Sequence, residues 1–287
     1  MKFYTVLHND REVVAAEGKN GLLFSLETLG LNVQDMNGLI EQWDSAADQL
    51  KKALAVADPA AALKDYRILA PIPRPKQDVV CLGVNYHDHK KEAVQGIDFV
   101  KTAETIYFSK RVNRANDPGG LIPYYDFVDS LDYETELGVV LKKDCFRVMP
   151  EEARDYIFGY TVINDVSARN VQKRHQQWYL GKSLDGYTPM GPCIVTLDEI
   201  GDPHDLFIRC SVNGEPRQDS NTKYMITSVE EAISELSRGM TLQKGTVIAT
   251  GTPAGVIMGM KTPVWLKPGD VVRCEIEKIG VLENVIG

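Results

Sequence analysis

Two stretches of the chain differ in their pattern of hydrophobic and polar residues. In residues 1–70, short apolar runs alternate with polar turns, and two longer runs carry apolar residues at helical spacing. This pattern predicts strands at Lys2–Leu7, Glu12–Ala16 and Leu22–Leu26 and helices at Met36–Trp43 and Ala47–Ala57. The second helix is expected to end before Pro59, because proline cannot continue a helix.

Residues 69–75 read Leu-Ala-Pro-Ile-Pro-Arg-Pro and contain three prolines. A segment so rich in proline is stiff and extended. We therefore expect a boundary here, between a small accessory domain formed by residues 1–70 and a larger domain formed by residues 71–287.

After Asp78 the pattern becomes rich in strands. Strands are predicted at Val79–Val84, Thr105–Phe108, Thr135–Leu141, Gly159–Ile163, Cys193–Thr196, Phe207–Val212, Val247–Thr250 and Val271–Ile276. Helical spacing is found only in the short segments His89–Val94, Glu151–Asp155 and Val229–Ser237. Many strands with few helices predict an α+β domain dominated by a curled sheet, not a doubly wound one.

Composition narrows the possible partners. The chain has 32 basic and 40 acidic residues, a net charge of −8, which disfavours nucleic acid and anionic membrane surfaces. No apolar run approaches the ~20 residues that cross a bilayer, and the N-terminal segment lacks a signal core. The cysteines are scattered and form no CxxC pair, which favours free thiols over disulfides. A cytoplasmic protein is therefore expected.

The segment Asp-Tyr-Glu-Thr-Glu at residues 132–136 carries the first candidate chemistry. Glu134 and Glu136 are two residues apart, so on a strand their side chains point to the same face. Two neighbouring carboxylates repel unless a proton or a cation lies between them. Such an oxygen-rich pair suits Mg²⁺, Mn²⁺ or Ca²⁺. The alternative is the solvent-exposed polar face of an antiparallel strand.

A second polar group follows the strand predicted at Gly159–Ile163. Asp165 lies directly after this strand and is a candidate third carboxylate, with Arg169 and Gln172 close behind. The competing interpretation is that Asp165 caps the following turn or helix. Residues 178–192 are rich in glycine and proline and predict a shaped loop, from which Lys182 faces either a site or solvent.

The histidine segment follows the strand predicted at Val79–Val84. His89 and Glu92 are three residues apart, so they share one face of a helix. A carboxylate beside an imidazole raises its basicity, as a general base for water requires. Three alternatives remain: a charged surface helix, zinc binding by His87 and His89, and a nucleophile pair with Cys81.

Together these segments resemble the fumarylacetoacetate hydrolase family, from about Asp78 to the C-terminus. The matching motifs, in chain order, are Asn85-Tyr86, His89-x-x-Glu92, Phe108-Ser-Lys110, Asp132-Tyr-Glu-Thr-Glu136, Gly159-Tyr160, Asn164-Asp165-Val-Ser167-Ala-Arg169, Gly181-Lys182-Ser-x-Asp185, Pro189-Met-Gly-Pro192, Val212-Asn-Gly-Glu215, Asn221-Thr222, Thr250-Gly-Thr252-Pro253-Ala-Gly255, Lys267-Pro-Gly-Asp270 and Ile279-Gly-x-Leu-x-Asn284.

The resemblance implies a fold and a site. The fold would be a mixed β-sandwich roll of the α+β class with a small N-terminal α+β domain, assembled as a homodimer. The site would hold Mg²⁺ or Mn²⁺. Its residues would be the metal ligands Glu134, Glu136 and Asp165, the catalytic residues His89, Glu92 and Lys182, and the substrate-binding residues Lys110, Arg169, Gln172 and Thr252.

The resemblance also implies an activity on a small keto acid. The first expectation is a metal-dependent hydrolase that cleaves a carbon–carbon bond in a β-diketo acid or acylpyruvate, with His89 as the base for water. The alternative is an oxaloacetate-type decarboxylase or a keto–enol isomerase, which needs no attacking water. A non-catalytic binding protein is disfavoured, because the expected ligands and the His89–Glu92 pair are all present.

Overall fold

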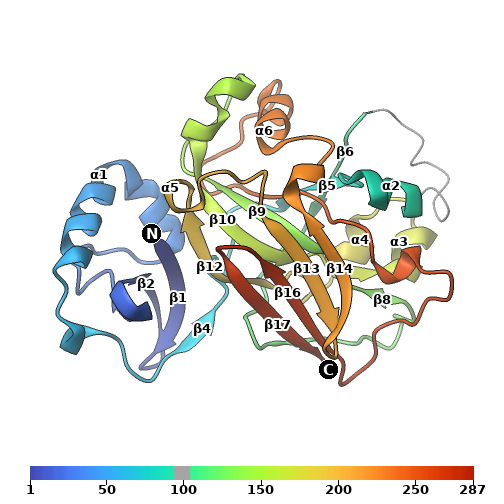
Figure 1. The fold of residues 1–287 in the computed structure, drawn as a ribbon, viewed down its shortest axis with the longest axis horizontal. Helices are drawn as coiled ribbons and strands as arrows, with labels where there is room; N and C mark the ends of the chain where they lie inside the picture. The colour runs from blue at the N-terminus through green and yellow to red at the C-terminus, as the bar shows by residue number, and fades with distance from the viewer. Residues whose placement is uncertain (94–103) are drawn as a thin grey trace.

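Two β-sheets that pack against each other form most of the protein (Figure 1). The computed structural model describes residues 1–93 and 104–287. In Figure 1 the smaller sheet lies in front of the centre of the larger one, and side chains from both sheets share one apolar core. This mixed α+β architecture with few helices is the predicted fold class.

The larger sheet has ten strands within the described residues. In spatial order they are β3 (Leu23–Ser25), β2 (Arg11–Glu17), β1 (Lys2–His8), β12 (Met190–Thr196), β10 (Ile157–Asn164), β9 (Thr135–Leu141), β15 (Val247–Ala249), β5 (Val79–Gly83) and β6 (Ile106–Lys110), with β4 (Arg67–Leu69) paired to β1. Neighbouring strands are antiparallel except β15 and β5, which are parallel.

The smaller sheet has five strands in the described part of the chain. In spatial order they are β14 (Glu215–Asn221), β13 (Phe207–Val212), β16 (Val271–Ile276), β17 (Gly280–Ile286) and β7 (Leu121–Ile122). A separate short ladder joins β8 (Leu131–Asp132) to β11 (Ser167–Ala168). This ladder lies at the ends of β9 and β10, where the candidate site residues are found.

The helices connect the strands, and the helix at residues 36–55 packs against one face of the larger sheet. The α-helices are α1 (Met36–Ala55), α2 (His87–Ala93), α3 (Arg169–Arg174), α4 (Tyr179–Lys182), α5 (Leu197–Ile200) and α6 (Val229–Ser237). The 3₁₀ helices are η1 (Lys19–Gly21), η2 (Pro59–Ala61), η3 (Pro150–Tyr156), η4 (Thr222–Tyr224) and η5 (Ile257–Gly259). None of the helices in the described ranges combines the length and apolar composition that a membrane crossing requires.

Three helix predictions differ from the structure. The two helices predicted at Met36–Trp43 and Ala47–Ala57 are one helix, α1, because the buried stripe continues through Ala46 to Leu50 and the residues between the two predicted helices, 44–46, include no glycine or proline. The helix predicted at Glu151–Asp155 is the 3₁₀ helix η3. The end of the helix predicted at His89–Val94 lies outside the described residues.

The first 70 residues extend the larger sheet. β1 pairs with β12, and the ring of Phe3 stacks on that of Phe158 from β10, at 5.9 Å between centroids. Trp43 of α1 contacts the same Phe158 ring edge-on, at 4.9 Å. Because each buried aromatic side chain contributes about 1.5–3 kcal/mol, this contact ties the segment to the larger unit. The domain boundary at residues 70–71 stays a prediction.

Strands β9 and β10 lie at the centre of the larger sheet and are buried along their whole length. Leu137 and Val139 of β9 point into the core shared with the smaller sheet, whereas Val140 points into the core under α1. The alternation therefore places Glu136 on the Val140 face, as the sequence predicted. Burial on both faces leaves no solvent-exposed polar face on β9.

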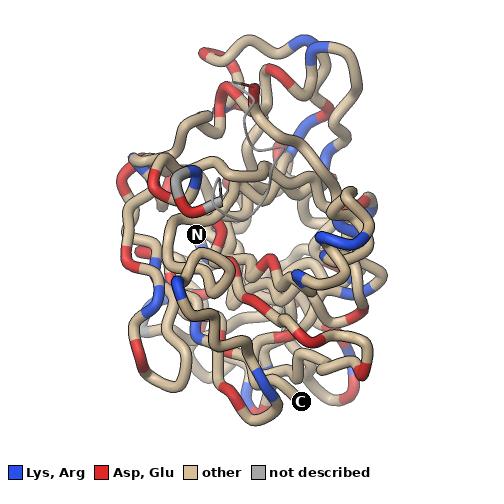
Figure 2. The backbone as a smooth tube through the Cα atoms, turned by 90° about the vertical axis from the view of Figure 1, so that its right-hand side faces the viewer, with Lys and Arg blue, Asp and Glu red and all other residues tan. Residues whose placement is uncertain are grey.

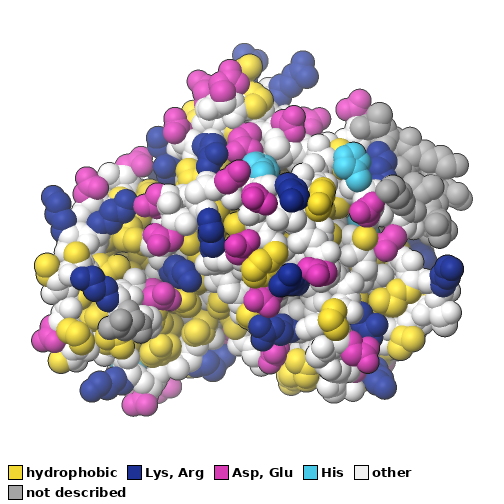
Figure 3. Space-filling view, viewed as in Figure 1, with side chains coloured by type: hydrophobic (Ala, Val, Ile, Leu, Met, Phe, Trp, Pro, Cys, Tyr) yellow, Lys and Arg dark blue, Asp and Glu magenta, His cyan; other side chains and the backbone are white. Residues whose placement is uncertain are grey.

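Charged side chains of both signs cover the surface. In Figure 2 acidic and basic positions alternate along the chain, and Figure 3 shows the same mixture on the face seen in Figure 1. The acidic excess of the sequence is therefore not gathered into one patch on that face.

Candidate active site and metal centre

Three carboxylates converge where β9 begins and β10 ends. Glu134, Glu136 and Asp165 each offer one oxygen, and these oxygens lie within 4.8 Å of one another. All three side chains are buried, Glu134 being the most exposed at 5%. This burial excludes the solvent-exposed strand that the sequence left open for the two glutamates.

The strand register holds these carboxylates together. Thr135 of β9 pairs with Asn164 of β10, and Glu136 pairs with Ile163. The Asn164 Oδ1 atom accepts a hydrogen bond from the Glu134 backbone N–H at 3.0 Å, and the Asp165 N–H donates to the Glu134 carbonyl at 2.8 Å. Backbone pairing therefore fixes the carboxylates before any ion binds.

Lys182 bridges two of the carboxylates. Its Nζ atom donates to Glu134 Oε2 at 2.7 Å and to Asp165 Oδ2 at 2.6 Å. The predicted loop is wrong for Lys182 itself, which lies at the end of α4 and is only 2% exposed, whereas residues 183–188 form neither helix nor strand. Gly181 permits the helix there: a Cβ at this position would lie 2.6 Å from the Gln172 backbone nitrogen, so only glycine lets α4 pack this closely on α3.

Two further cations complete the network. Arg169 donates from Nη2 to Glu134 Oε1 at 2.5 Å, from Nε to Asp132 at 2.9 Å and from Nη1 to the Gln172 amide oxygen at 3.1 Å. Lys110 donates to Asp165 Oδ1 and to the Tyr187 carbonyl and is fully buried. Lys110 thus lies behind Asp165 and does not line the cavity described below.

Glu136 has a different environment from Glu134. Within the described residues, Glu136 accepts a hydrogen bond from the Gly251 N–H at 2.8 Å and forms no ion pair. Burial, together with the charges of Asp165 and Glu134, raises its pKa well above its usual range. Burial also acts to raise the pKa of Glu134, but Lys182, Arg169 and His89 outweigh it and hold that pKa well below its usual range.

The donor set fits a hard divalent cation. The network has four carboxyl groups but only three cationic side chains, so one carboxyl group has no cationic partner within it. The carboxyl groups are those of Asp132, Glu134, Glu136 and Asp165, and the cations are those of Lys110, Arg169 and Lys182. Three buried carboxylate oxygens close together are the ligands that Mg²⁺, Mn²⁺ and Ca²⁺ prefer. The uncompensated Glu136 is the side chain that such an ion would satisfy.

A small cavity opens above these residues. We call Glu134, Glu136, Asp165, Arg169 and Lys182 the floor; of these, all but Asp165 line the cavity directly. The remaining lining residues, mostly apolar, are Leu82, Gly83, Val84, His89, Phe108, Gln172, Trp178, Thr252 and Met258. A charged floor with apolar sides suits a small anionic molecule.

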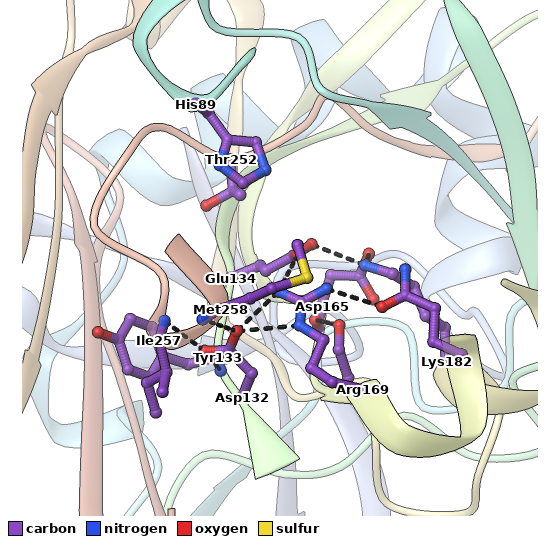
Figure 4. A network of polar contacts seen from close by, with 12 residues as sticks. His89, Asp132, Tyr133, Glu134, Asp165, Arg169, Lys182, Thr252, Ile257 and Met258 are labelled. Atoms are coloured by element: carbon purple, nitrogen blue, oxygen red, sulfur yellow. Dashed lines mark hydrogen bonds and ion pairs between the residues drawn. The ribbon is translucent and has the colours of Figure 1, made fainter. Parts of the chain in front are cut away.

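Helix α2 supplies the opposite wall, and Figure 4 shows His89 facing the floor across the cavity. His89 is 4% exposed, which excludes the charged surface helix. Its Nδ1 atom lies 3.5 Å from Glu92 Oε2, and Glu92 accepts from the Gly255 N–H at 3.2 Å. We call His89 and Glu92 the α2 wall.

The other histidine alternatives lack support in the described residues. His87 is exposed and belongs to no group of metal-binding side chains found there. Cys81 is fully buried, and burial raises the pKa of its thiol strongly, so it is a poor nucleophile. Asp165 is likewise no simple turn cap, because its carboxylate bonds both Lys110 and Lys182.

Thr252 and Gln172 both line the cavity. The Thr252 hydroxyl donates to the Thr135 carbonyl at 2.9 Å and accepts from Gln218 at 2.7 Å. Sequence reasoning missed Gln218, which reaches this loop from β14, and no local pattern marks it. It also missed Asp132, although this residue stands in the same motif as the two glutamates.

Comparison with known proteins places this geometry in a family. Residues 78–287 match the family model described as fumarylacetoacetate (FAA) hydrolase C-terminal. The chain is 37% identical to oxaloacetate tautomerase YisK of Bacillus subtilis over 99% of this chain and 96% of that protein. It is 40% identical to the human mitochondrial oxaloacetate tautomerase FAHD2A over 88% of this chain and 79% of that protein.

A solved structure agrees over the whole length. The fumarylacetoacetate hydrolase from psychrophilic Exiguobacterium antarcticum superposes with a TM-score of 0.84 and 37% identity, covering 100% of this chain and 99% of that one. The matched range begins at Asp78, which is where the sequence resemblance was expected to begin. The chain therefore belongs to the fumarylacetoacetate hydrolase family of enzymes.

Proposed function

We propose that the protein is a divalent-metal-dependent keto–enol tautomerase of a small 2-keto acid, with oxaloacetate as the substrate class. One observation carries the proposal: a small cavity has three clustered carboxylates and Lys182 on one side and His89 on the other. Relatives that match most of the chain are named as oxaloacetate tautomerases, which favours this reaction over the alternatives.

Glu134, Glu136 and Asp165 would hold Mg²⁺ or Mn²⁺. When bound, the ion supplies Lewis-acid polarisation of a keto oxygen and balances the negative charge of the substrate. Lys182 also supplies positive charge beside the reacting carbonyl, and Arg169 binds the substrate carboxylate together with the Gln172 amide. Lys110 supports Asp165 from behind, since its ammonium group is directed at that carboxylate. Thr252 borders the substrate.

His89 is the proposed proton carrier. Because its Nδ1 atom is turned toward Glu92, the Nε2 atom is the one that can reach a substrate in the cavity. His89 takes a proton from carbon 3 of the keto form and passes it to the 2-keto oxygen, which completes the enol. In the reverse direction it carries the proton from that oxygen back to carbon 3, and Glu92 stabilises the imidazolium that forms between the two transfers. Apolar side chains such as Phe108 and Trp178 keep bulk water from the enol.

Hydrolysis of an acylpyruvate is the second candidate, and the His89–Glu92 pair favours it. An imidazole oriented by a carboxylate can equally take a proton from water, and the resulting hydroxide would attack the distal carbonyl. The same residues therefore serve both reactions, and the difference lies in whether a water molecule has room beside the substrate.

One assay separates the candidates. Protein stripped with EDTA is supplied with Mn²⁺ or Mg²⁺, and the decay of enol oxaloacetate is followed by its ultraviolet absorbance. Acylpyruvates are tested in parallel for release of two acids. We expect metal-dependent tautomerisation without cleavage. Cleavage with no acceleration of tautomerisation would replace the proposal by the hydrolase, and loss of carbon dioxide from oxaloacetate would replace it by the decarboxylase.

We also propose that the enzyme acts as a homodimer in the cytoplasm, without nucleic acid or membrane partners, as the family resemblance and the acidic charge favour. Light scattering coupled to gel filtration measures the molecular mass in solution and so tests the dimer directly. A mass near the 32.0 kDa of one chain would contradict the dimer.

A further inference from the structure

The Asp132 carboxylate lies outside the three clustered carboxylates but touches both sides of the cavity. It is fully buried and accepts four hydrogen bonds, all from N–H donors. Its Oδ1 atom accepts from the Tyr133 and Ile257 backbone at 2.9 Å each. Its Oδ2 atom accepts from the Met258 backbone at 3.1 Å and from Arg169 Nε at 2.9 Å (Figure 4).

The Arg169 contact connects Asp132 to the floor. The same guanidinium binds Glu134 and the Gln172 amide oxygen. Arginine has a planar fork of donors, so fixing Nε on Asp132 sets the direction of the remaining N–H groups. Without that anchor, the guanidinium is held only by Glu134 and Gln172, both of which line the cavity.

The backbone contacts connect Asp132 to the turn beneath α2. Met258 belongs to η5 and lines the cavity. Residues 255–259 also contact Glu92. The Gly255 N–H donates a hydrogen bond to the Glu92 carboxylate, and a Cβ added at Gly259 would lie 2.8 Å from the same carboxylate. We call residues 255–259 the Glu92 seat. Tyr133 adds a hydrogen bond from its hydroxyl to the Gly255 carbonyl at 2.7 Å.

We propose that Asp132 is a positioning residue that fixes Arg169 of the floor and the Glu92 seat relative to each other. The substrate carboxylate bound by Arg169 and the imidazole oriented by Glu92 are then held in the correct relative geometry. The proposal rests on the proposed function, because it assigns Arg169 to the substrate and Glu92 to His89. Asp132 itself touches neither substrate nor metal.

A carboxylate is required at this position because every partner is a donor. Asparagine has the same shape but only one acceptor oxygen. In either orientation its NH₂ group would face two N–H donors, either the pair at Oδ1 or the pair at Oδ2. The Asp132→Asn variant therefore leaves two buried N–H groups without an acceptor, which disfavours the native position of whichever segment carries them.

The first test compares Asp132→Asn with Asp270→Asn. Asp270 is a matched control, because it is also a buried carboxylate that accepts N–H donors, from Asn213 and Lys267, in a hairpin outside the cavity. For Asp132→Asn we expect kcat/KM to fall about 10–100-fold, with KM raised and kcat lowered. Mn²⁺ affinity by titration calorimetry should fall less than kcat/KM does, since the three ligands are retained. Asp270→Asn should change neither kinetic constant.

The second test disturbs the Glu92 seat alone. Gly259→Ala places a methyl group against Glu92 and leaves Asp132 and Arg169 intact. We expect a lower kcat with KM nearly unchanged, in contrast to the combined effect of Asp132→Asn. Gly239→Ala is the control, because a Cβ there meets nothing within 4 Å.

Amide hydrogen exchange gives a readout that needs no turnover. In Asp132→Asn, exchange at residues 255–259 should become faster, and in Asp270→Asn it should stay as in the wild type. Unchanged exchange and unchanged kinetics in Asp132→Asn would overturn the proposal. If the wild type shows no keto-acid activity, the proposed function fails, and hydrogen exchange still decides whether Asp132 holds the seat. Should Asp132→Asn not fold, Gly259→Ala with wild-type kcat would overturn it.

Discussion

The floor and the α2 wall of the cavity are held in different ways. The floor is built on β9, β10, α3 and α4, and its carboxylates share backbone bonds and ion pairs with Lys182 and Arg169. The α2 wall stands on a seven-residue helix, and Glu92 contacts the Glu92 seat through the Gly255 N–H at 3.2 Å or more. Within the described residues, the floor is held by ion pairs between buried side chains, and Glu92 of the α2 wall is held by His89 and the Gly255 N–H.

This difference suggests a division of tasks. Residues that hold a cation must be preorganised, because like charges converge only where the fold forces them together. A residue that exchanges protons with a substrate, as proposed for His89, needs only to lie at the correct distance from the reacting atom. We therefore expect changes in the floor to affect metal binding and stability, and changes in the wall to affect turnover.

Glu136→Gln tests the floor most severely. It removes the one clustered carboxylate that has no cationic partner in the described residues, so Mn²⁺ affinity should fall more than about 100-fold and activity with it. The metal-free protein should be no less stable, because glutamine replaces a carboxyl group whose ionisation is disfavoured by burial and by the charges of Asp165 and Glu134. Calorimetry and urea unfolding measure the two effects.

The exposed Glu215→Gln is the matched control, since that glutamate pairs only with Arg217 on the surface. Wild-type Mn²⁺ affinity in Glu136→Gln would mean that the metal, if any, binds elsewhere.

His89→Ala tests the wall. The loss of the proton carrier should lower kcat by about 10²–10⁴-fold, the usual contribution of general acid–base catalysis, while Mn²⁺ affinity stays close to that of the wild type. His87→Ala is a control on the same helix, because His87 is exposed. If both variants keep the wild-type kcat, the α2 wall takes no part in the reaction.

Local patterns predicted the strands that carry the floor but not the contacts between distant segments. Alternation along β9 was enough to place Glu136 on the face opposite Leu137 and Val139, and the two cores that the β9 side chains join alternate in the same way. The convergence of Glu134 with Asp165 depends on pairing between strands and could only be inferred from the combined motifs. Lys182 was expected on a loop because Gly181 reads as a loop former, whereas here glycine permits close helix packing.

Positioning contacts were the least predictable. Glu92 meets Gly255 across 163 residues, and Asp132 meets Met258 across 126. Neither hydrophobic spacing nor turn chemistry carries information at such separations, because both describe only neighbouring residues. A helix can likewise be longer than its clearest pattern, as α1 shows by running through Ser45 without a break.

Lys182→Met tests how far the stability of the metal-free protein depends on the cationic side chains of the floor. Its ammonium bridges two buried carboxylates, so its removal should destabilise the metal-free protein by about 3–5 kcal/mol. Mn²⁺ should then raise the melting temperature more in the variant than in the wild type, because the ion replaces the missing charge. The exposed Lys51→Met, which loses only a surface pair with Asp198, should stay within about 1 kcal/mol. An equal metal-induced shift in Lys182→Met and the wild type would contradict this account.

A second imidazole–carboxylate pair lies away from the cavity and can be compared with the His89–Glu92 pair of the α2 wall. Its removal should have the smallest effect on stability of the changes considered. His204 Nε2 lies 2.6 Å from Glu230, closer than His89 lies to Glu92. Hydrogen bonding to Glu230 raises the pKa of His204 above its usual 6.5, against the opposing effect of burial. Burial acts to raise the pKa of Glu230, but His204 outweighs it and holds that pKa below its usual 4.5.

The two shifts define a pH window for the His204–Glu230 pair. The raised histidine pKa stabilises the fold below about pH 6.5, and this contribution is lost as the pH rises through the folded pKa. The lowered glutamate pKa stabilises it above about pH 4.5 and is lost in acid. His204→Ala should therefore cost about 0.5–1 kcal/mol between these values and less outside them, as measured by urea unfolding across pH. Turnover should not change, because neither residue lines the cavity, and a pH-independent loss of stability would show that His204 acts by packing alone.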